Sequence, residues 1–249
     1  MSFIDKGTLF KQSGYVLERN LLSSIEVDYL QEETLSLVKR FGEKHDIEST
    51  LPCVRDNIVG AEKTESLQCE NVHFYSASYS RLMVDERIVG MATKIMGLSH
   101  VQLFGTKVIV KPAKNGSPEP LHQDHVYFPH KNHSPVSAIF FLEDSTEHSS
   151  QICVLPDSHK QGALEHDKEG GLHLPFDTYS LATATPIKVQ AGDVMFVDYL
   201  TAYGMSFNRS PHTQTFIVVT MRDPDDELED GYTAPLGCNL MIQGISKNF

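Results

Sequence analysis

The sequence predicts one α+β domain that is mainly β, with helices first and a sandwich or barrel of short strands after them. Helical spacing of apolar residues is confined to the first part of the chain, about 1–100. From about 101 to 222, short β-branched segments alternate with turns rich in Gly, Pro, Asn and Asp. No repeat, linker or low-complexity segment separates the two parts, so we expect a single domain over 1–249.

The first predicted helix covers 23–41. Ser23 can cap its N-terminus, Glu26 completes a Ser-x-x-Glu capping box, and Gly42 can end the helix. The face expected to be buried follows helical spacing and consists of Val27, Leu30, Thr34, Leu37, Val38 and Phe41. This pattern indicates a scaffold helix.

A second, shorter helix is predicted over 85–96. Asp85 suits its N-cap and Gly97 suits its C-terminal end. Its apolar face consists of Ile88, Met91, Ala92 and Ile95. The segment between the two helices, 43–80, is polar and has no clean period.

Strands are expected from residue 101 onward. They cover 101–112, 121–128, 136–144, 150–156, 186–190, 193–198 and 214–222. A long insert, 159–183, is a candidate lid, because long loops in compact domains are often functional. The end of the chain, 223–249, begins with the acidic run DPDDELEDG, which we expect to be solvated.

The composition indicates an ordinary globular protein, with 40% hydrophobic and 22% charged residues. A net charge of −12 disfavours general binding to nucleic acid or to an anionic membrane, both of which call for basic patches. A local basic pocket for an anionic substrate stays compatible with this net charge.

The four cysteines form no C-x-x-C pair, so neither a zinc finger nor a redox dithiol is indicated. The N-terminal sequence lacks the apolar core of a secretory signal, and no apolar run is long enough for a transmembrane helix. We therefore expect a cytoplasmic protein with free thiols.

His122 and Asp124 are the strongest chemical signal in the sequence. On a regular strand, side chains two residues apart point to the same face, so this His and this carboxylate could bind one metal ion. Two such ligands suit the 2-His-1-carboxylate triad of non-haem Fe(II) oxygenases, which needs a second His from a distant strand.

Four segments in the same order resemble the phytanoyl-CoA dioxygenase family of Fe(II)/2-oxoglutarate oxygenases. The segment 14–33 resembles the N-terminal helix entry of that family, and 101–129 resembles its strand, loop and His-x-Asp segment. The segment 137–162 ends in a Pro-x-Ser-His-Lys-x-Gly signature, and 191–210 resembles the stretch that carries the distal His. The resemblance covers most of the chain.

This resemblance implies a double-stranded β-helix of the jelly-roll or cupin-like kind, with flanking N-terminal helices. It also implies Fe(II) and 2-oxoglutarate as cofactors and the hydroxylation, or a related oxidation, of a small organic molecule, as in specialised metabolism. O₂ is consumed, and succinate and CO₂ leave. A facial triad leaves three positions on iron, enough for a bidentate keto acid and O₂.

The chain departs from the family pattern at two positions. Tyr203 stands where the resemblance places the distal His, and Gln214 stands where it places an Arg that pairs with the distal carboxylate of 2-oxoglutarate. Gln offers only neutral hydrogen bonds in place of a bidentate ion pair. If the keto acid binds, its anchor is expected among Lys107, Lys111 and Arg209.

Three interpretations follow. In the first, the protein is an Fe(II)-dependent oxygenase with His122 and Asp124 as ligands and Tyr203, water or substrate in the third position. In the second, iron binds without 2-oxoglutarate and the fold carries out a keto-acid-independent reaction. In the third, the chain is a catalytically degenerate homologue that binds a ligand or stabilises a partner in a homo- or hetero-oligomer. Substrate contacts are expected from the variable loops 43–80 and 159–183.

Other polar residues near these motifs are expected to be peripheral. His212 lies in the turn NRSPHT, and Pro211 disfavours a place on the strand that faces the metal. His125 should face away from His122 if the strand stays regular, while His130 and His133 lie in loop sequence. Ser137 could contact a keto-acid carboxylate, but an ordinary strand serine is the commoner case.

Overall fold

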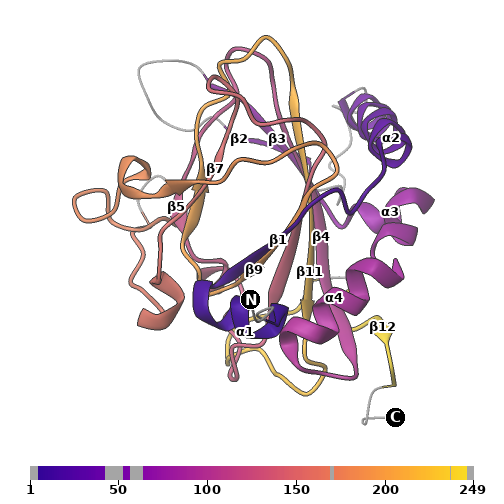
Figure 1. Ribbon diagram of the computed structural model, residues 1–249, viewed down its shortest axis with the longest axis vertical. Helices are drawn as coiled ribbons and strands as arrows, with labels where there is room; N and C mark the ends of the chain where they lie inside the picture. Colours follow the sequence, from indigo (N-terminus) through magenta and orange to yellow (C-terminus); the bar gives the residue numbers. More distant parts are fainter. Residues whose placement is uncertain (1–4, 43–52, 57–63, 169–170, 236, 246–249) are drawn as a thin grey trace.

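Two antiparallel sheets enclose the interior of the molecule (Figure 1). The structure is a computed structural model that describes residues 5–42, 53–56, 64–168, 171–235 and 237–245. In spatial order, the larger sheet consists of β1 (Tyr15–Glu18), β9 (Val194–Asp198), β6 (Val136–Phe141), β11 (Gln214–Arg222), β4 (Val101–Lys111), β3 (Ser66–Glu70) and β2 (Cys53–Asp56), and β12 (Met241–Gln243) also pairs with β4. The smaller sheet consists of β5 (Glu119–His122), β10 (Tyr203–Met205), β7 (Ile152–Val154) and β8 (Thr185–Pro186).

Four α-helices lie on the outside of the larger sheet or at its end (Figure 1). They are α1 (Lys6–Ser13), α2 (Ser24–Gly42), α3 (Ala77–Leu82) and α4 (Glu86–Met96). Short 3-10 turns occur at η1 (Val72–Phe74), η2 (Asp124–Val126), η3 (Ser158–Gln161) and η4 (Leu181–Thr183). The predicted class, mainly β with a double-stranded arrangement and N-terminal helices, is confirmed.

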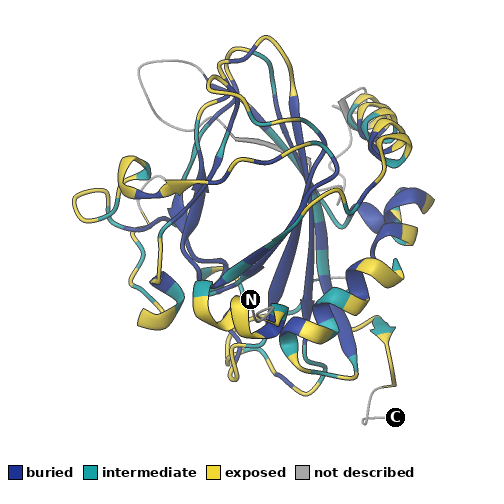
Figure 2. Ribbon diagram, in the orientation of Figure 1, coloured by how far each residue is buried: buried dark blue, intermediate teal, exposed yellow. Residues whose placement is uncertain are grey.

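The alternation of side chains along β4 explains the two apolar layers. Val108 and Val110 pack with the helices in one core cluster, whereas Ile109 packs between the two sheets with strands of the smaller one. Lys107 and Lys111 share the inner face with Ile109, because they are two residues away from it in either direction. Figure 2 shows that buried residues run along the strands of both sheets, as expected for strands covered on both faces.

Both predicted helices are confirmed together with their caps. The hydroxyl of Ser23 accepts a hydrogen bond from the backbone N–H of Glu26 at 3.3 Å, and the Glu26 carboxylate accepts one from the Ser23 N–H at 2.7 Å. Asp85 caps α4 through the backbone N–H of Arg87. The Arg87 guanidinium also bridges Asp85 and Glu26, and it lowers the pKa of Glu26 to about 2. The N-termini of α2 and α4 are thereby tied together.

Several short strands differ from the prediction. The strand expected over 121–128 ends at His122, where the chain turns into η2, and the strand expected over 186–190 is only Thr185–Pro186. The strands β1 and β10 were not predicted, because three or four residues are too few to establish a period. The segment 43–80 lies partly outside the described residues, and its described part contains β2, β3, η1 and the start of α3.

The expectation of a solvated acidic run is confirmed for Asp225, Glu227, Glu229 and Asp230, which are exposed, but it is wrong for Asp226. Asp226 is buried and accepts hydrogen bonds from the backbone N–H groups of Asn132 and Ser134, at 2.8 and 2.9 Å. Further along, β12 adds to the edge of β4. A carboxylate that receives two backbone N–H groups fixes the loop that donates them.

Within the described part of the chain, no helix has both the length and the apolar character needed to cross a bilayer. The longest, α2, carries acidic and basic residues along most of its length.

Candidate active site

His122 ends β5 with one ring nitrogen free to bind a metal. Its Nδ1 donates to the backbone carbonyl of Pro120 at 2.9 Å, so Nε2 carries the lone pair. A metal-ligating His usually has its other nitrogen held in this way, which fixes both the tautomer and the ring orientation. In the smaller sheet, His122 lies directly opposite Tyr203 of β10.

Asp124 meets His122 although it does not continue the strand. Its Oδ1 lies 3.8 Å from His122 Nε2 and accepts a hydrogen bond from the Tyr203 hydroxyl at 2.8 Å. Its Oδ2 accepts a hydrogen bond from the Ser137 hydroxyl at 2.9 Å, and Ser137 is also bonded to Thr220. The two predicted ligands are therefore brought together, but a turn rather than strand alternation does so.

Gln123 fixes the turn between these two residues. It is fully buried, its amide donates to the carbonyl of Gly162, and its side-chain oxygen accepts from the N–H of Leu164 at 2.8 Å. Its backbone N–H donates to Nε2 of His166 at 3.0 Å. The start of the long insert thus holds the His-x-Asp segment. Sequence reasoning missed Gln123, because a Gln between two ligands carries no signal of its own.

Tyr203 lies inside the apolar cluster between the sheets and is 3% exposed. Burial, with the negative charge of Asp124 beside it, raises the pKa of the phenol well above its ordinary value. The phenol therefore keeps its proton and donates a hydrogen bond to the Asp124 carboxylate. Within the described residues, no second His, Cys or acidic side chain joins His122 and Asp124 in a three-ligand group.

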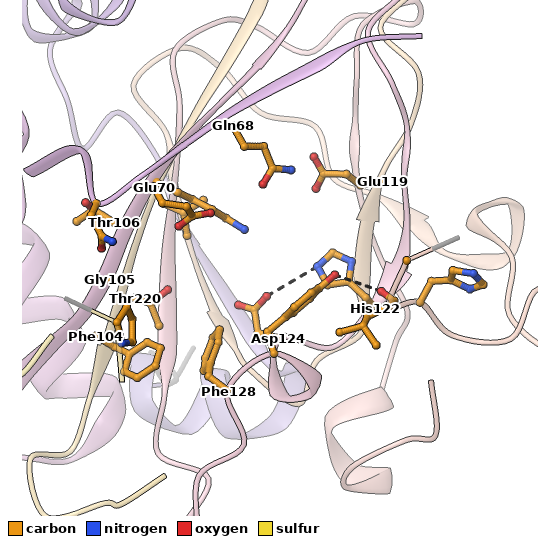
Figure 3. Close-up of a pocket in the computed structure, with 18 of the residues that line it drawn as sticks. Gln68, Glu70, Phe104, Gly105, Thr106, Glu119, His122, Asp124, Phe128 and Thr220 are labelled. Atoms are coloured by element: carbon orange, nitrogen blue, oxygen red, sulfur yellow. Dashed lines mark hydrogen bonds and ion pairs between the residues drawn. The ribbon is translucent and has the colours of Figure 1, made fainter. Parts of the chain in front are cut away.

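A cavity of about 720 Å³ opens beside His122 and Asp124. Its apolar wall includes Phe104, Tyr127 and Phe128, and its polar wall includes Gln68, Glu70 and Glu119 (Figure 3). This volume and this mixture of apolar and polar groups are typical of a site for a small organic molecule. The segment Gly171–His173 of the long insert and the tail residues Thr233 and Pro235 also line it.

Lys107 is the only Lys or Arg among the described residues that line this cavity. Burial by itself lowers the pKa of the Lys107 ammonium, but the carboxylates of Glu70, Asp124 and Glu119 outweigh burial and raise it. Burial raises the pKa of Glu70, against the attraction of Lys107. Lys107 therefore stays charged in a cavity in which carboxylates outnumber cations.

The other predicted anchors lie away from the cavity. Gln214 is buried behind the apolar cluster, where its side-chain oxygen accepts from the backbone N–H of Ser150. Lys111 is paired with Gln214 across the sheet and is fully buried, and its ammonium donates to the carbonyl of Ser117 and contacts Glu119 at 3.3 Å. Arg209 is exposed on a loop, where its guanidinium stacks over Phe207.

The four histidines expected to be peripheral do not line the cavity. His212 is exposed in its turn. His125 packs against Tyr199 and His133 on the far side of η2, and His130 is buried beside Arg222. Ser137 is a different case, because its hydroxyl directly contacts Asp124. The sequence identified this serine but could not give its direction.

The donor set fits an iron ion at His122 and Asp124, because a free imidazole nitrogen and a carboxylate oxygen face one another at the cavity wall. A keto acid fits less well at Gln214, which does not line the cavity and whose side-chain oxygen already accepts a hydrogen bond from Ser150. The only cationic group that a keto acid in the cavity could reach among the described lining residues is Lys107.

Comparisons with known proteins identify relatives of this chain by sequence and by fold. The sequence profile of the phytanoyl-CoA dioxygenase (PhyH) family matches residues 10–216. A probable alpha-ketoglutarate-dependent hypophosphite dioxygenase of Stutzerimonas stutzeri is 31% identical over 97 residues, which are 39% of this chain and 33% of that protein. The peroxisomal phytanoyl-CoA dioxygenase of Bos taurus is 26% identical over 226 residues, 83% of this chain and 64% of that protein. The chain thus spans less than two thirds of each of these relatives.

The fold is shared with solved structures. The non-haem alpha-ketoglutarate-dependent epimerase SnoN from nogalamycin biosynthesis superposes with a TM-score of 0.70 at 20% sequence identity, covering 96% of this chain and 97% of that one. At this identity the likeness extends to the arrangement of the two sheets and their helices.

Proposed function

Because this chain belongs to the phytanoyl-CoA dioxygenase (PhyH) family, we propose that it is a non-haem Fe(II)-dependent oxygenase that uses 2-oxoglutarate to oxidise a small organic molecule. The observation that carries this proposal is the approach of His122 Nε2 to Asp124 Oδ1, 3.8 Å apart, at the wall of a cavity of about 720 Å³. The relatives named above, one of them alpha-ketoglutarate-dependent by name, support it.

The residues around the two ligands orient them. The Pro120 carbonyl holds the His122 ring, while Ser137 and Tyr203 each donate to one oxygen of Asp124. Both carboxylate oxygens are thereby fixed before a metal arrives, which lowers the reorganisation that binding requires. When bound, iron and the keto acid supply the oxidising power for attack on an unactivated C–H bond.

Tyr203 serves this site as a hydrogen-bond donor rather than as a third metal ligand. Its proton is retained because the phenol is buried next to a carboxylate. His122 and Asp124 are then the two protein ligands, and more positions are left on the metal than in a site with a distal His.

Lys107 is the group that we assign to the keto acid. It lines the cavity with Asp124 and stays protonated, whereas Lys111 is already bonded to Ser117 and close to Glu119. Lys acts as a point charge and gives a less directional contact than the bidentate Arg of the family pattern.

The cavity wall supports a small-molecule substrate. Phe104, Tyr127 and Phe128 provide an apolar surface that excludes water next to the two ligands. The net charge of −12 argues against a nucleic-acid substrate. The free thiols of Cys153 and Cys238 suit a reducing compartment, which supports a cytoplasmic location.

Anaerobic titration of metal-free protein with Fe(II), then with 2-oxoglutarate, tests the proposal by calorimetry and visible absorbance. We expect one-to-one iron binding that His122→Ala abolishes, followed by a keto-acid charge-transfer band. Lys107→Met should weaken keto-acid binding about tenfold or more and leave iron binding intact. The exposed Lys188→Met removes the same charge outside the cavity and should change neither.

The other outcomes point to different functions. Iron binding without any response to the keto acid would support a 2-oxoglutarate-independent reaction, for which the engaged carbonyl of Gln214 is the favouring observation. Failure to bind iron would contradict the oxygenase proposal and leave a ligand-binding or partner-stabilising homologue.

A further inference from the structure

We propose that the substrate of this cavity carries an ammonium group and that Glu70 is the residue that binds it. The inference rests on the proposed function, because it assumes a metal at Asp124 and a keto acid at Lys107. It adds the chemical class of the substrate, an amine with an apolar body.

The inference starts from the charges on the cavity wall. Three carboxylates line the described part of it, those of Glu70, Glu119 and Asp124, against the single ammonium of Lys107. Glu119 has a cation of its own behind the wall, because the Lys111 ammonium lies 3.3 Å from its Oε1. The negative charge of Asp124 would be balanced by the bound metal ion. Glu70 is left to share Lys107, its neighbour in register on β4.

Binding of the keto acid changes this balance. The distal carboxylate of the keto acid forms an ion pair with the Lys107 ammonium. Glu70 then loses the only cation among the described lining residues that offsets its negative charge. A carboxylate left in a partly buried site without a cation is costly, and it favours whatever positive group enters. The enzyme with keto acid bound therefore lacks one positive charge in the cavity, and a monocationic substrate supplies it.

The geometry also fits an amine with an apolar body. Glu70 and Gln68 lie on β3, across the cavity from His122 and Asp124 (Figure 3). The ring of Phe128 lies beside Asp124 on the apolar side (Figure 3). A substrate whose ammonium contacts Glu70 would place its apolar part along this wall and toward the metal. Figure 3 further shows the side chains of Gln68 and Glu119 facing one another, where Gln68 can add a neutral acceptor.

A purely structural role for Glu70 gives a different expectation. The described residues show no hydrogen bond or ion pair between its carboxylate and Lys107, although the two residues are paired across the strands. Were Glu70 present only to neutralise Lys107, its replacement would alter keto-acid binding and have no effect specific to a cationic ligand.

The test is calorimetric titration of the anaerobic Fe(II)- and 2-oxoglutarate-loaded protein, and of the metal-free protein, with three probes of equal length. These are n-hexylammonium, 1-hexanol and hexanoate. In the loaded protein we expect the affinity for n-hexylammonium to be higher than that for 1-hexanol by about tenfold or more. Hexanoate should bind most weakly of the three. The loaded Glu70→Gln variant should bind n-hexylammonium about tenfold more weakly than the loaded wild-type protein does.

Glu147→Gln is the matched control, because Glu147 is exposed and its replacement makes the same change in net charge. It should keep the wild-type affinity for n-hexylammonium. Equal affinity for the alcohol and the ammonium, absence of binding by n-hexylammonium, or an unchanged affinity in Glu70→Gln would each overturn the inference. Retention of the keto-acid band in Glu70→Gln shows that the variant is folded and loaded.

The two proposals fail separately. The keto-acid band is read in the absence of any amine, so its absence counts against the proposed function alone. In protein that shows the keto-acid band, a preference for 1-hexanol over n-hexylammonium would overturn the amine assignment and leave the proposed function standing; the metal-free protein, in which Lys107 still offsets Glu70, is the reference.

Discussion

The hydroxyl of Tyr203 donates a 2.8 Å hydrogen bond to Oδ1 of Asp124, the same oxygen that lies 3.8 Å from Nε2 of His122. The residue that stands in place of the distal His thus serves the carboxylate of the same site. Its ring is buried in the apolar cluster between the two sheets, and its hydroxyl points to Asp124.

Replacement of Tyr203 by Phe tests this role. The ring and its packing stay, and only the hydrogen bond to Asp124 is lost, at a cost of about 1–3 kcal/mol because the acceptor is charged. We expect Fe(II) to bind with an affinity reduced by about tenfold, while His122→Ala abolishes binding. After oxidation to Fe(III), the wild-type protein should show no intense visible phenolate band. A band present in the wild type and lost in Tyr203→Phe would instead identify Tyr203 as a ligand.

Ser137→Ala removes the other hydrogen bond to Asp124. Because loss of a group that orients a metal ligand typically lowers metal affinity 10- to 100-fold, we expect iron binding to weaken by about that factor. The thermal midpoint of the metal-free protein should fall only slightly, since Ser137 contributes one hydroxyl to a buried network with Thr220. The exposed Ser99→Ala is the control. Equal iron affinity in both variants would show that Ser137 is an ordinary strand serine.

Gln214→Arg restores the family residue but should not restore a keto-acid site. Lys111 is paired with Gln214 on the same face of the sheet and is fully buried, so a second cation there is repelled and has no carboxylate of its own. An unpaired buried charge costs about 3–5 kcal/mol, so we expect a clear loss in the free energy of unfolding measured with urea. Keto-acid affinity should not rise. Unchanged stability together with tighter keto-acid binding would show that the interior near Gln214 is open to ligand.

Glu143 gives the protein a specific dependence of stability on pH. Burial raises its pKa to about 7, although it accepts hydrogen bonds from the N–H of Thr215 and the amide of Gln31. The folded state therefore binds a proton that the unfolded chain, with an ordinary value of 4.5, releases. The free energy of unfolding should fall as pH rises from about 4.5 to about 7.

In Glu143→Gln the amide side chain cannot ionise, so the contribution of this position to the free energy of unfolding should become independent of pH. We expect the variant to gain stability relative to wild type as pH rises from about 5 to about 8, as measured by urea unfolding at several pH values. Glu147→Gln, an exposed change of the same kind, should follow the wild-type curve. Parallel curves for the wild type and Glu143→Gln would contradict the raised pKa.

The sequence was sufficient for α2, α4 and the long central strands, whereas the short helices α1 and α3 were not predicted. The capping box of Ser23 and Glu26, and the cap of Asp85, are local signals that need no tertiary information. The long strands β4 and β11 carry enough β-branched residues to be recognised. Short strands such as β10 are defined by their partners on both sides, and such partners lie far away in the sequence.

The candidate site divides in the same way. His122 and Asp124 follow from their spacing, although the structure joins them through a turn that Gln123 fixes. Sequence periodicity places Lys107 and Lys111 on one face but cannot tell which of them reaches the cavity. That depends on Ser117 and Glu119, which engage Lys111. Glu70 lies in a segment without a clean period, so it could not be assigned to the cavity wall before the sheet order was known.

The return of the C-terminal segment onto the β core has a consequence for the order in which the protein matures. Thr233 and Pro235 line the cavity, and β12, which pairs with β4, follows them in the sequence. Because synthesis proceeds from the N-terminus, these parts of the chain are made last. A nascent chain that has emerged only as far as Arg222 already contains His122, Asp124 and every strand of both sheets except β12. The proposed metal ligands are therefore synthesised before the residues that complete the cavity wall. Under the proposed function, the new chain would gain its metal ligands first and its selectivity for substrate last.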